Sequence, residues 1–300
     1  KGAEWYKGTA NAISQNISFI ERYRPDNVLI LSGDHIYKMD YANMLRFHEE
    51  KEADCTIAAR TVPLEEASRF GIMNTEADGR IYEFEEKPPH PKNDQASMGI
   101  YIFRWSVLKQ FLLADEENPD SENDFGKNVI PAILGAKLRV YAYPFRGYWR
   151  DVGTINSLWE ANMDTLGSDP LFDLQSERGG KIYARNTALP ATCFEETADV
   201  SESNVAEGCE IGGKIRHSVI STGCTVREDA VIADSVIMPN VTVEKGAVIR
   251  HAIIAEDCVI GEGCVVGEDQ TGDPVSRKIA VVGKGKQIAP GQVVAPGAIV

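Results

Sequence analysis

The stretch "VIADSVIMPNVTVEKGAVIRHAIIAEDCVIGEGCVV" (residues 231–266) carries the pattern that decides the fold of the second half of the chain. Aliphatic residues recur in it and just before it at steps of six, six and five, so the pattern repeats every 17 residues. The nine positions are Ile220, Val226, Ile232, Ile237, Val243, Ile249, Ile254, Ile260 and Val266. Smaller residues keep the same register, in the sets Cys224, Val241, Cys258 and Ala230, Ala247, Cys264.

One short strand about every six residues, three per turn, predicts a triangular parallel β-helix filled by a stack of aliphatic side chains. An antiparallel sandwich fits less well, because its turns recur at roughly 8–12 residues. After an insertion around "EDQTGDPVSRK" the period resumes at Val282, Ile288, Val294 and Val300. The pattern is still in period at Val300, so we expect the β-helix to continue past it.

Strands and helices alternate in the first half of the chain. Apolar runs predict strands over residues 28–31, 55–60, 80–86, 97–103 and 138–145, and helical spacing predicts helices over 9–23, 40–51, 124–136 and 154–166. Such alternation predicts a largely parallel sheet covered on both faces. We expect this domain to span residues 1–170, a Gly- and Pro-containing linker to span 171–200, and the β-helix to span 201–300.

In the stretch "NVLILSGDHIYKMDY" (residues 27–41), an apolar strand runs into Ser32, Gly33 and then Asp34. Ligands of such sheets bind beyond the carboxyl ends of the strands. Asp34 is therefore the first candidate for a functional side chain.

Composition narrows the class of protein. The chain has 300 residues and a net charge of −14, which argues against nucleic-acid partners and anionic membranes. We find neither an apolar run long enough to span a bilayer nor a signal peptide. The six cysteines have no zinc spacing, so we expect reduced, packed thiols in the cytoplasm; they are Cys55, Cys193, Cys209, Cys224, Cys258 and Cys264.

Seven motifs, in order, carry a resemblance to a known family: "WYKGTANAI", "ILSGDHIYKMDY", "FGIM", "EFEEKP", "SMGIYIF", "DFGKNVIP" and "YWRDVGT". With the β-helix after them, the chain resembles the bacterial glucose-1-phosphate adenylyltransferases (ADP-glucose pyrophosphorylases) over essentially its whole length. The resemblance implies an α/β Rossmann-like nucleotidyltransferase domain with a mostly parallel sheet, then a left-handed parallel β-helix of hexapeptide repeats. The family's glycine-rich nucleotide loop, of the form GGxGxRLxPLT, should precede Lys1. We therefore expect the chain as given to be an N-terminally truncated fragment that is inactive by itself.

The family reaction joins ATP and glucose 1-phosphate into ADP-glucose and pyrophosphate, for glycogen synthesis. The sugar phosphate is already largely ionised at pH 7, so positioning and cations matter more than a general base. The resemblance implies that Asp34 and Asp151 hold the cofactor Mg²⁺ and that Lys87 is a catalytic cation for the sugar phosphate. The alternatives are a helix cap or turn for Asp34, a cap of the helix starting near Thr154 for Asp151, and a solvated side chain for Lys87.

Further contacts to glucose 1-phosphate are implied by the resemblance for Glu86, Ser97, Tyr6, Gly71 and Asp124. Gly71 also has a physical rationale, because a missing side chain lets backbone approach a ligand. Packing and capping roles remain open for Tyr6 and Asp124.

Neighbouring residues suggest supporting roles. His35 follows Asp34, but without a second His or Cys at ligand spacing we expect it to be structural. Lys38 and Asp40 are expected to order the loop and cap the next helix. Trp149 braces Asp151 or belongs to the core.

Three rival functions stay open. The first is transfer of another nucleotide, from UTP, dTTP or GTP, onto a hexose phosphate. The second is a non-catalytic regulatory subunit, although the presence of both Asp34 and Asp151 weighs against it. The third is an acyltransferase, for which His217 and His251 are the only candidate histidines in the β-helix; surface positions on equivalent corners are the simpler interpretation.

The family also implies partners. We expect the β-helix to carry subunit contacts of a homotetramer, or of a heterotetramer with a related subunit. We also expect it to help build a site for allosteric metabolite effectors.

Overall fold

The computed structural model describes residues 5–175, 180–184, 188–267 and 278–300. The expected insertion lies almost entirely outside the described residues, as do parts of the expected linker. The chain forms two compact units, one from Lys1–Gly33 and Met39–Gly147 and the other from Asp34–Lys38 and Tyr148–Val300. The domain boundaries expected near residues 170 and 200 stay a prediction.

The first unit is built on a six-stranded sheet. Its strands are β1 (Asn27–Ile30), β3 (Cys55–Thr61), β4 (Gly71–Thr75), β5 (Ile81–Glu86), β6 (Gln95–Arg104) and β7 (Val140–Pro144). The order is β5-β4-β6-β3-β7, and β1 also pairs with β6. Four strands, β1, β3, β4 and β7, run in one direction, while β5 and β6 run against them. The prediction of a mostly parallel sheet therefore holds for strand direction, and β6 makes the sheet mixed by inserting antiparallel between strands of the majority direction.

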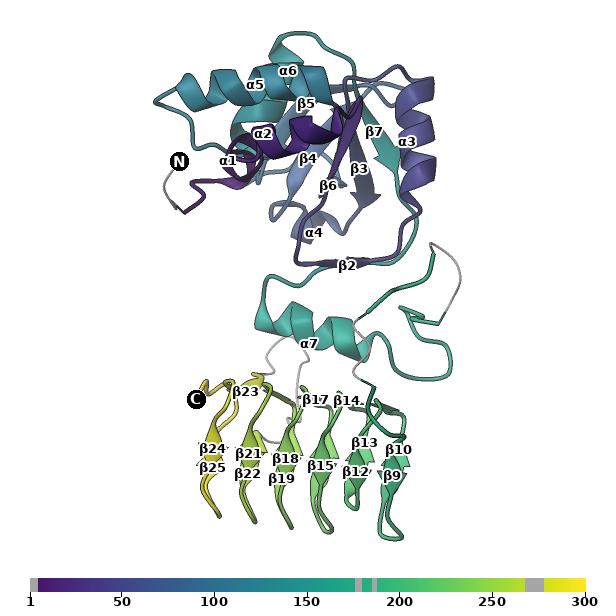
Figure 1. Ribbon diagram of the computed structural model, residues 1–300, viewed down its shortest axis with the longest axis vertical. Coiled ribbons are helices and arrows are strands. Elements are labelled where there is room, and N and C mark those ends of the chain that lie inside the picture. Colours follow the sequence, from purple (N-terminus) through teal and green to yellow (C-terminus); the bar gives the residue numbers. More distant parts are fainter. Residues whose placement is uncertain (1–4, 176–179, 185–187, 268–277) are drawn as a thin grey trace. The chain divides into compact units, whose positions relative to one another are not determined.

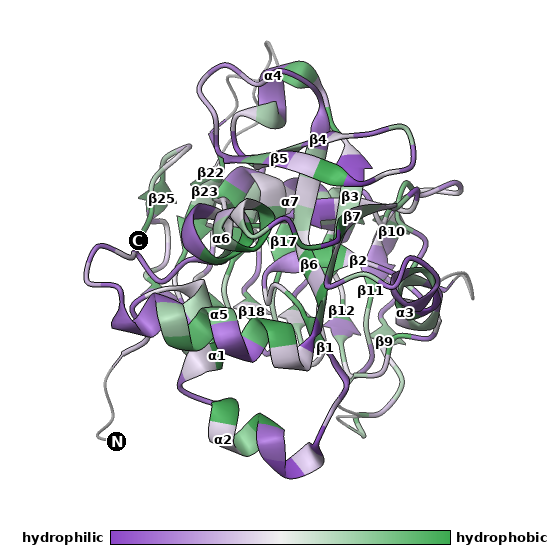
Figure 2. Ribbon diagram, turned by 90° about the horizontal axis from the view of Figure 1, so that it is seen from above, coloured by the Kyte–Doolittle hydropathy of each residue, from purple (hydrophilic) through white to green (hydrophobic). Residues whose placement is uncertain are grey.

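Helices cover both faces of this sheet, as expected (Figure 1). They are α1 (Thr9–Ser14), α2 (Ile17–Ile20), the 3₁₀ turn η1 (Glu21–Tyr23), α3 (Tyr41–Glu50), α4 (Leu64–Ala67), α5 (Trp105–Glu117), the π-helical η2 (Phe125–Val129) and α6 (Ile130–Gly135). Cys55 and Ile57 of β3 pack with Leu108 of α5, whereas the hydroxyl of Thr56 between them bonds His48 of α3 at 2.8 Å. Because strand side chains alternate, α5 and α3 lie on opposite faces, as Figure 2 shows.

Three local details differ from the expected elements. Neither β4 nor α5 follows from the strand and helix patterns identified in the sequence. The helix expected over 9–23 is divided into α1, α2 and η1. At the first break the Asn16 side chain donates to the Ala12 carbonyl (2.8 Å), which is the competition with backbone bonding typical of Asn. The last turn ends at Arg24, whose φ is 47°, immediately before Pro25.

The second unit begins with a two-stranded ladder of β2 (His35–Tyr37) and β8 (Trp149–Asp151), followed by helix α7 (Ile155–Met163). Seventeen short strands follow in the described part of this unit. They are β9 (Cys193–Phe194), β10 (Asp199–Ser201), β11 (Asn204–Val205), β12 (Glu210–Ile211), β13 (Lys214–Arg216), β14 (Val219–Ile220), β15 (Thr225–Val226), β16 (Val231–Ala233), β17 (Val236–Ile237), β18 (Thr242–Val243), β19 (Val248–Arg250), β20 (Ala252–Ile254), β21 (Val259–Ile260), β22 (Val265–Gly267), β23 (Ala280–Val282), β24 (Gln287–Ile288) and β25 (Val293–Val294).

These strands form three parallel sheets, which confirms the predicted β-helix and its register (Figure 1). Ile220 pairs with Ile237, and Ile237 pairs with Ile254 on the next coil. All nine aliphatic positions of the repeat are buried in one core with the predicted cysteines and alanines. Cys193 is exposed, and the other five cysteines are buried free thiols. No helix among the described residues is long and apolar enough to cross a membrane.

Candidate functional site

The β2–β8 ladder brings two of the candidate carboxylates together. Asp34 immediately precedes β2, and the next residue, His35, pairs with Asp151 at the end of β8. The Val152 N–H donates to the Asp34 carbonyl (3.1 Å), which extends the ladder by one bond. A Cβ added at Gly153 would lie 3.0 Å from Asp151 Oδ1 and 3.9 Å from Asp34 Oδ2. Both carboxylates therefore border the same small space, which the missing side chain of Gly153 leaves open.

The imidazole of His35 lies between Trp149 and the Asp34 carboxylate. Its ring meets the Trp149 ring edge-on at 5.3 Å, and Trp149 Nε1–H donates to His35 Nδ1 (3.3 Å). Because Nδ1 accepts, the ring proton is on Nε2, which lies 3.8 Å from Asp34 Oδ1. The side chain of His35 is 11% exposed and that of Asp34 is 62% exposed. His35 is thus a structural neighbour of the Asp34 carboxylate, as expected. Trp149 contacts His35 and so supports the site indirectly.

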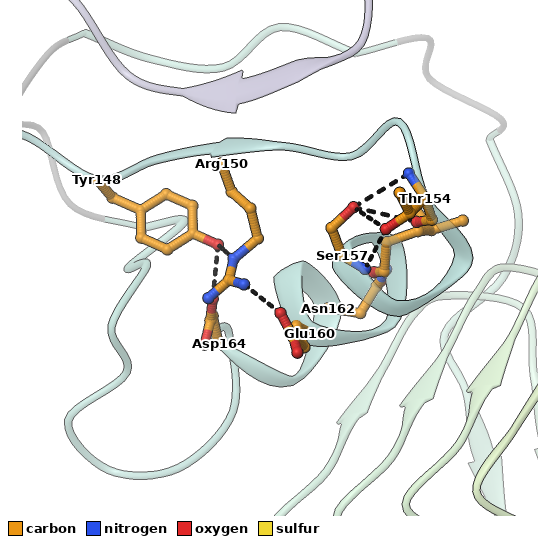
Figure 3. Close-up of polar contacts among 8 residues, drawn as sticks. Tyr148, Arg150, Thr154, Ser157, Glu160, Asn162 and Asp164 are labelled. Atoms are coloured by element: carbon orange, nitrogen blue, oxygen red, sulfur yellow. Dashed lines mark hydrogen bonds and ion pairs between the residues drawn. The ribbon is translucent and has the colours of Figure 1, made fainter. Parts of the chain in front are cut away.

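The capping roles considered for Asp34 and Asp151 belong to other residues. Asp40 is the N-cap of α3 and accepts from Ala42 N (3.0 Å). Thr154, not Asp151, caps α7 in a reciprocal capping box with Ser157 (Figure 3). Asp151 Oδ1 instead accepts the Gly153 N–H (2.8 Å) in a tight turn.

A polar network ties the β8 segment to α7 (Figure 3). The Tyr148 hydroxyl donates to Asp164 Oδ2 (2.7 Å), and Arg150 pairs with the same oxygen (2.7 Å) and with Glu160. Burial, followed by the hydrogen bond to Asp164, raises the pKa of Tyr148 to about 12. The network holds the strand that carries Asp151 against the helix that follows it.

The donor set at Asp34 and Asp151 suits a hard divalent cation. Both residues offer carboxylate oxygens, and Mg²⁺ typically takes one or two protein carboxylates and completes its shell with water and phosphate oxygens. Among the described residues, no cluster of three or more His, Cys, Asp or Glu side chains forms a closed metal cage. The pair is therefore suited to a cation shared with a ligand rather than to a structural metal.

In the first unit, the Glu86 carboxylate is enclosed by two glycines. Glu86 ends β5 and pairs with Gly71 at the start of β4. An added Cβ would lie 2.9 Å from Glu86 Oε2 at Gly71 and closer still at Gly126, so a side chain at either position would require the Glu86 carboxylate to move. Burial raises the pKa of Glu86, the Asp124 carboxylate raises it further, and Lys87 and Lys127 oppose the shift.

Asp124 combines the expected capping role with a place beside Glu86. Its Oδ1 accepts from Gly126 N (2.8 Å) and Lys127 N (3.0 Å) at the start of η2. Its Oδ2 accepts from the hydroxyl of Thr9, at the start of α1, at 3.0 Å. The same Thr9 oxygen accepts the Phe125 N–H (3.1 Å), which locks α1 to η2.

Lys87 follows Glu86 with a left-handed backbone, φ 48°. Its N–H donates to the Phe70 carbonyl (3.1 Å) beside Gly71. The Lys87 Nζ lies 3.8 Å from Glu86 Oε1, and the side chain is 65% exposed. The strained backbone of Lys87 holds its accessible ammonium group beside the semi-buried Glu86 carboxylate. A lysine that was merely solvated would not need such a fixed backbone.

The remaining candidates lie at the edge of this cluster or apart from it. Ser97 is 7% exposed, pairs with Ala59, and accepts the Gly99 N–H (3.3 Å). Burial raises the pKa of Tyr101, a Ser97 hydrogen bond opposes the shift, and the Glu86 carboxylate adds to it. Ser97 and Glu86 therefore both act on the Tyr101 hydroxyl. Tyr6 is 58% exposed, and its hydroxyl accepts from Asn16 (3.2 Å), the N-cap of α2, so its known contact is at the break between α1 and α2.

The expected residues thus form two groups, each within one unit: Asp34 with Asp151, and Glu86 with Gly71, Lys87, Ser97 and Asp124. The sequence interpretation missed Gly153, Gly126 and Thr9. The two glycines lie in the motifs "YWRDVGT" and "DFGKNVIP". In each motif the glycine is two residues after a candidate aspartate, and this spacing could have identified them.

The two β-helix histidines take structural positions. His217 Nδ1 lies 2.7 Å from Asp234 Oδ1, and both residues have positive φ at one corner of the helix, as does His251. His251 is 7% exposed and packs edge-on against Trp159 of α7 (4.6 Å). The corner positions were expected, but His251 is buried under α7 rather than on the surface.

Comparison with known proteins gives two family matches. Residues 3–168 match the model "Nucleotidyl transferase", and residues 190–293 match "GlmU-like, C-terminal hexapeptide". The second match agrees with the three parallel sheets and identifies the β-helix as the left-handed hexapeptide type.

Curated relatives are similar over most of the chain. A glucose-1-phosphate adenylyltransferase of Clostridium perfringens (strain SM101) is 58% identical over 244 residues, which cover 81% of this chain and 63% of that protein. The protein of the same name from Desulforamulus reducens is 50% identical over 289 residues, 96% of this chain and 72% of its own length. One from Bacillus thuringiensis (strain Al Hakam) is 52% identical over 256 residues, 85% and 68% of the two chains. The chain spans 63% of the length of the first of these relatives.

Proposed function

We propose that this chain, which belongs to the glucose-1-phosphate adenylyltransferase family of nucleotidyl transferases, is part of an enzyme that joins ATP and glucose 1-phosphate into ADP-glucose and pyrophosphate. The observation that carries the proposal is the convergence of Asp34 and Asp151 on the open space at Gly153. These two carboxylates are 117 residues apart in the sequence and are the pair that the family resemblance implies for Mg²⁺.

In this proposal Asp34 and Asp151 hold Mg²⁺. When bound, the ion neutralises phosphate charge and polarises the phosphorus that is attacked. The chain's own contribution is to hold both carboxylates still: β2 and β8 fix their backbones, His35 Nε2–H faces Asp34, and Gly153 N–H orients Asp151.

Lys87 and Glu86, both in the first unit, are proposed to bind the sugar phosphate. The accessible Lys87 ammonium is suited to the phosphate as a point charge, and the semi-buried Glu86 carboxylate is suited to accept hydrogen bonds from sugar hydroxyls. Gly71 and Gly126 leave room for the Glu86 carboxylate in its present position. Asp124, Ser97 and Tyr6 are proposed as further contacts to glucose 1-phosphate, and Tyr6 has the least structural support.

A regulatory, non-catalytic subunit is the second candidate function. It is disfavoured by the retention of both carboxylates with their supporting residues His35 and Gly153. Transfer from UTP, dTTP or GTP is a third candidate. It is distinguished from transfer from ATP only by comparing turnover with each nucleotide. We also propose cytoplasmic localisation, allosteric control by small metabolites, and a tetramer with contacts through the β-helix.

The test is pyrophosphate release by the full-length protein, including any residues encoded before Lys1, with Mg²⁺, glucose 1-phosphate and each of the four nucleoside triphosphates. We expect turnover with ATP, and a loss on the order of 10²–10³-fold on Asp34→Asn, because an electrostatic contact to the transition state is removed. Asp40→Asn is the control, since Asp40 caps α3 and does not border the site. A folded protein without turnover on any nucleotide would favour the regulatory subunit.

The subunit proposal is tested separately by the mass of the full-length protein in solution, with and without residues from about 180 onward. An unchanged tetramer after that truncation contradicts a role of the β-helix in assembly.

A further inference from the structure

The loop that joins β5 to β6 begins with Lys87 and is anchored at both ends. At its start, the Lys87 N–H donates to the Phe70 carbonyl (3.1 Å), and the next residue, Pro88, is buried. At its end, Asn93 Nδ2 donates to the Met73 carbonyl of β4 (3.1 Å). The loop therefore lies against the sheet rather than standing free in solvent.

Lys92 supplies the charged part of the second anchor. Its Nζ donates to Glu83 Oε1 (2.9 Å) and forms an ion pair with Glu85 Oε1 (2.6 Å). The other carboxylate oxygen of Glu83 accepts from Asn74 Nδ2 (2.7 Å). Two carboxylates that share one ammonium group would repel each other without it, so both of them favour the position that Lys92 occupies. Hydrogen bonds to Glu85 and then Glu83 raise the pKa of Lys92, which keeps it charged.

This anchor lies on the opposite face of the sheet from Glu86. Side chains alternate along β5, so Glu83 and Glu85 point to one face. Phe84 and Glu86 point to the other, where Phe84 belongs to the hydrophobic core of the unit. Because Lys92 is bound on the first face, it can influence a ligand held by Glu86 only through the loop.

The loop between the two anchors is short and stiff. Three of the four residues between Lys87 and Lys92 are prolines, namely Pro88, Pro89 and Pro91. Each proline ring fixes its own φ and restricts the residue before it, so few backbone torsions remain free. Lys87 has a φ of 48°, a conformation that persists only where the surrounding structure imposes it. Fixing Lys92 therefore restricts the position of Lys87.

We propose that Lys92 is a positioning residue for Lys87. By binding Glu83 and Glu85 it fixes the proline-rich loop, and the loop holds the Lys87 ammonium group where it meets the phosphate of the sugar phosphate. Lys92 itself does not touch the substrate. This inference rests on the proposed role of Lys87 in binding glucose 1-phosphate.

The first test does not rely on any reaction. Hydrogen exchange of the Lys87 amide is followed by mass spectrometry at single-residue resolution, in the full-length protein. Lys92→Met keeps the length of the side chain without its charge, and Lys92→Arg keeps a cation that can pair with both carboxylates. We expect exchange to be about threefold or more faster in Lys92→Met and to be restored in Lys92→Arg. Lys109→Met, which removes another exposed ion pair of this unit, with Glu21, should leave it unchanged. Unchanged exchange in Lys92→Met overturns the proposal.

The second test measures steady-state kinetics with saturating ATP and Mg²⁺. Lys92→Met should raise KM for glucose 1-phosphate about three- to tenfold and leave kcat and KM for ATP within about twofold. In a Lys87→Ala background the same substitution should have no further effect, because Lys92 acts only through Lys87. Losses that simply add in the double variant overturn the positioning role.

Failure of the proposed function has a different signature. If Lys87→Ala leaves KM for glucose 1-phosphate unchanged, the role of Lys87 is wrong, and the substrate part of this inference is overturned with it. The exchange measurement decides separately whether Lys92 fixes the loop.

Discussion

Asp151 stands directly opposite His35 in the β2–β8 ladder, and this pairing places its carboxylate beside that of Asp34. A methyl group added at the neighbouring Gly153 would lie within 4 Å of both carboxylates. This geometry makes the carboxylate pair directly testable without changing either aspartate.

Gly153→Ala should reduce turnover while leaving the fold intact. The new Cβ would lie 3.0 Å from Asp151 Oδ1, so that oxygen must shift by a few tenths of an ångström. We expect a loss of about tenfold or more in kcat/KM and weaker activation by Mg²⁺, because catalytic groups need positions held to well under an ångström. Steady-state kinetics over a range of Mg²⁺ concentrations checks this.

Gly135→Ala is the control for that substitution, since an added Cβ at the end of α6 would meet nothing within 4 Å. Equal kinetics for the two variants would mean that the space at Gly153 is not used.

Glu86→Gln should stabilise the protein at neutral pH. The folded-state pKa of Glu86 is raised, first by burial and then by Asp124. A raised pKa for an acid means that ionisation is disfavoured in the folded state, so the penalty is absent at pH values below the unfolded pKa and complete above the folded one. The gain in Tm on substitution should therefore grow as pH rises from about 3 to 7, measured by thermal unfolding.

Glu83→Gln should show the opposite sign. The hydrogen bond from Lys92 lowers the pKa of Glu83, so the stability that this carboxylate provides is present above its unfolded pKa and disappears as pH falls. The two variants together separate the burial effect from a general effect of removing charge. A Tm difference of the same sign at both positions would contradict this account.

At Glu86 we additionally expect a higher KM for glucose 1-phosphate.

Trp159→Phe should weaken the attachment of α7 to the β-helix. Trp159 Nε1–H donates to the Asp234 carbonyl (2.8 Å), and its ring packs beside Val236 and Ile253. Phe keeps most of the apolar contact and removes the hydrogen bond, so the free energy of unfolding should fall by about 1 kcal/mol. Urea denaturation followed by far-UV circular dichroism measures it. An unchanged free energy of unfolding would mean that this hydrogen bond stabilises the protein no more than the bonds to water that replace it in the unfolded chain.

Ile249→Ala should be among the most damaging single changes to the β-helix. Ile249 is fully buried and stacks between Ile232 and Val266 on the adjoining coils. Truncation to Ala should lower the free energy of unfolding by about 2–5 kcal/mol through lost burial and a residual cavity. The neighbouring Val248, only half-buried and on the other face of β19, is the control. A loss at Val248→Ala as large as that at Ile249→Ala would show that the interior stack is not what stabilises the coils.

The first unit was less predictable from sequence than the second. The strands at 55–60, 80–86 and 97–103 were identified, but the short β4 was not, and the position of β6 between β4 and β3 follows from packing rather than from any local signal. The helix at 9–23 has the right apolar face but is broken, because side chains of Asn11 and Asn16 bond nearby backbone and side-chain groups instead of allowing one continuous helix.

The repeat pattern is sufficient to specify the β-helix, down to which aliphatic residues stack on which. The sequence also points to Asp34, which lies four residues beyond the end of β1 and immediately before β2. Both are local properties: each coil contacts its neighbours along the chain, so a fixed period specifies the register. That Asp34 meets Asp151, and that Glu86 lies between Gly71 and Gly126, depends on tertiary contacts. These contacts join residues up to 117 positions apart, and they depend on which strands close into a ladder, which is settled by the packing of the whole unit.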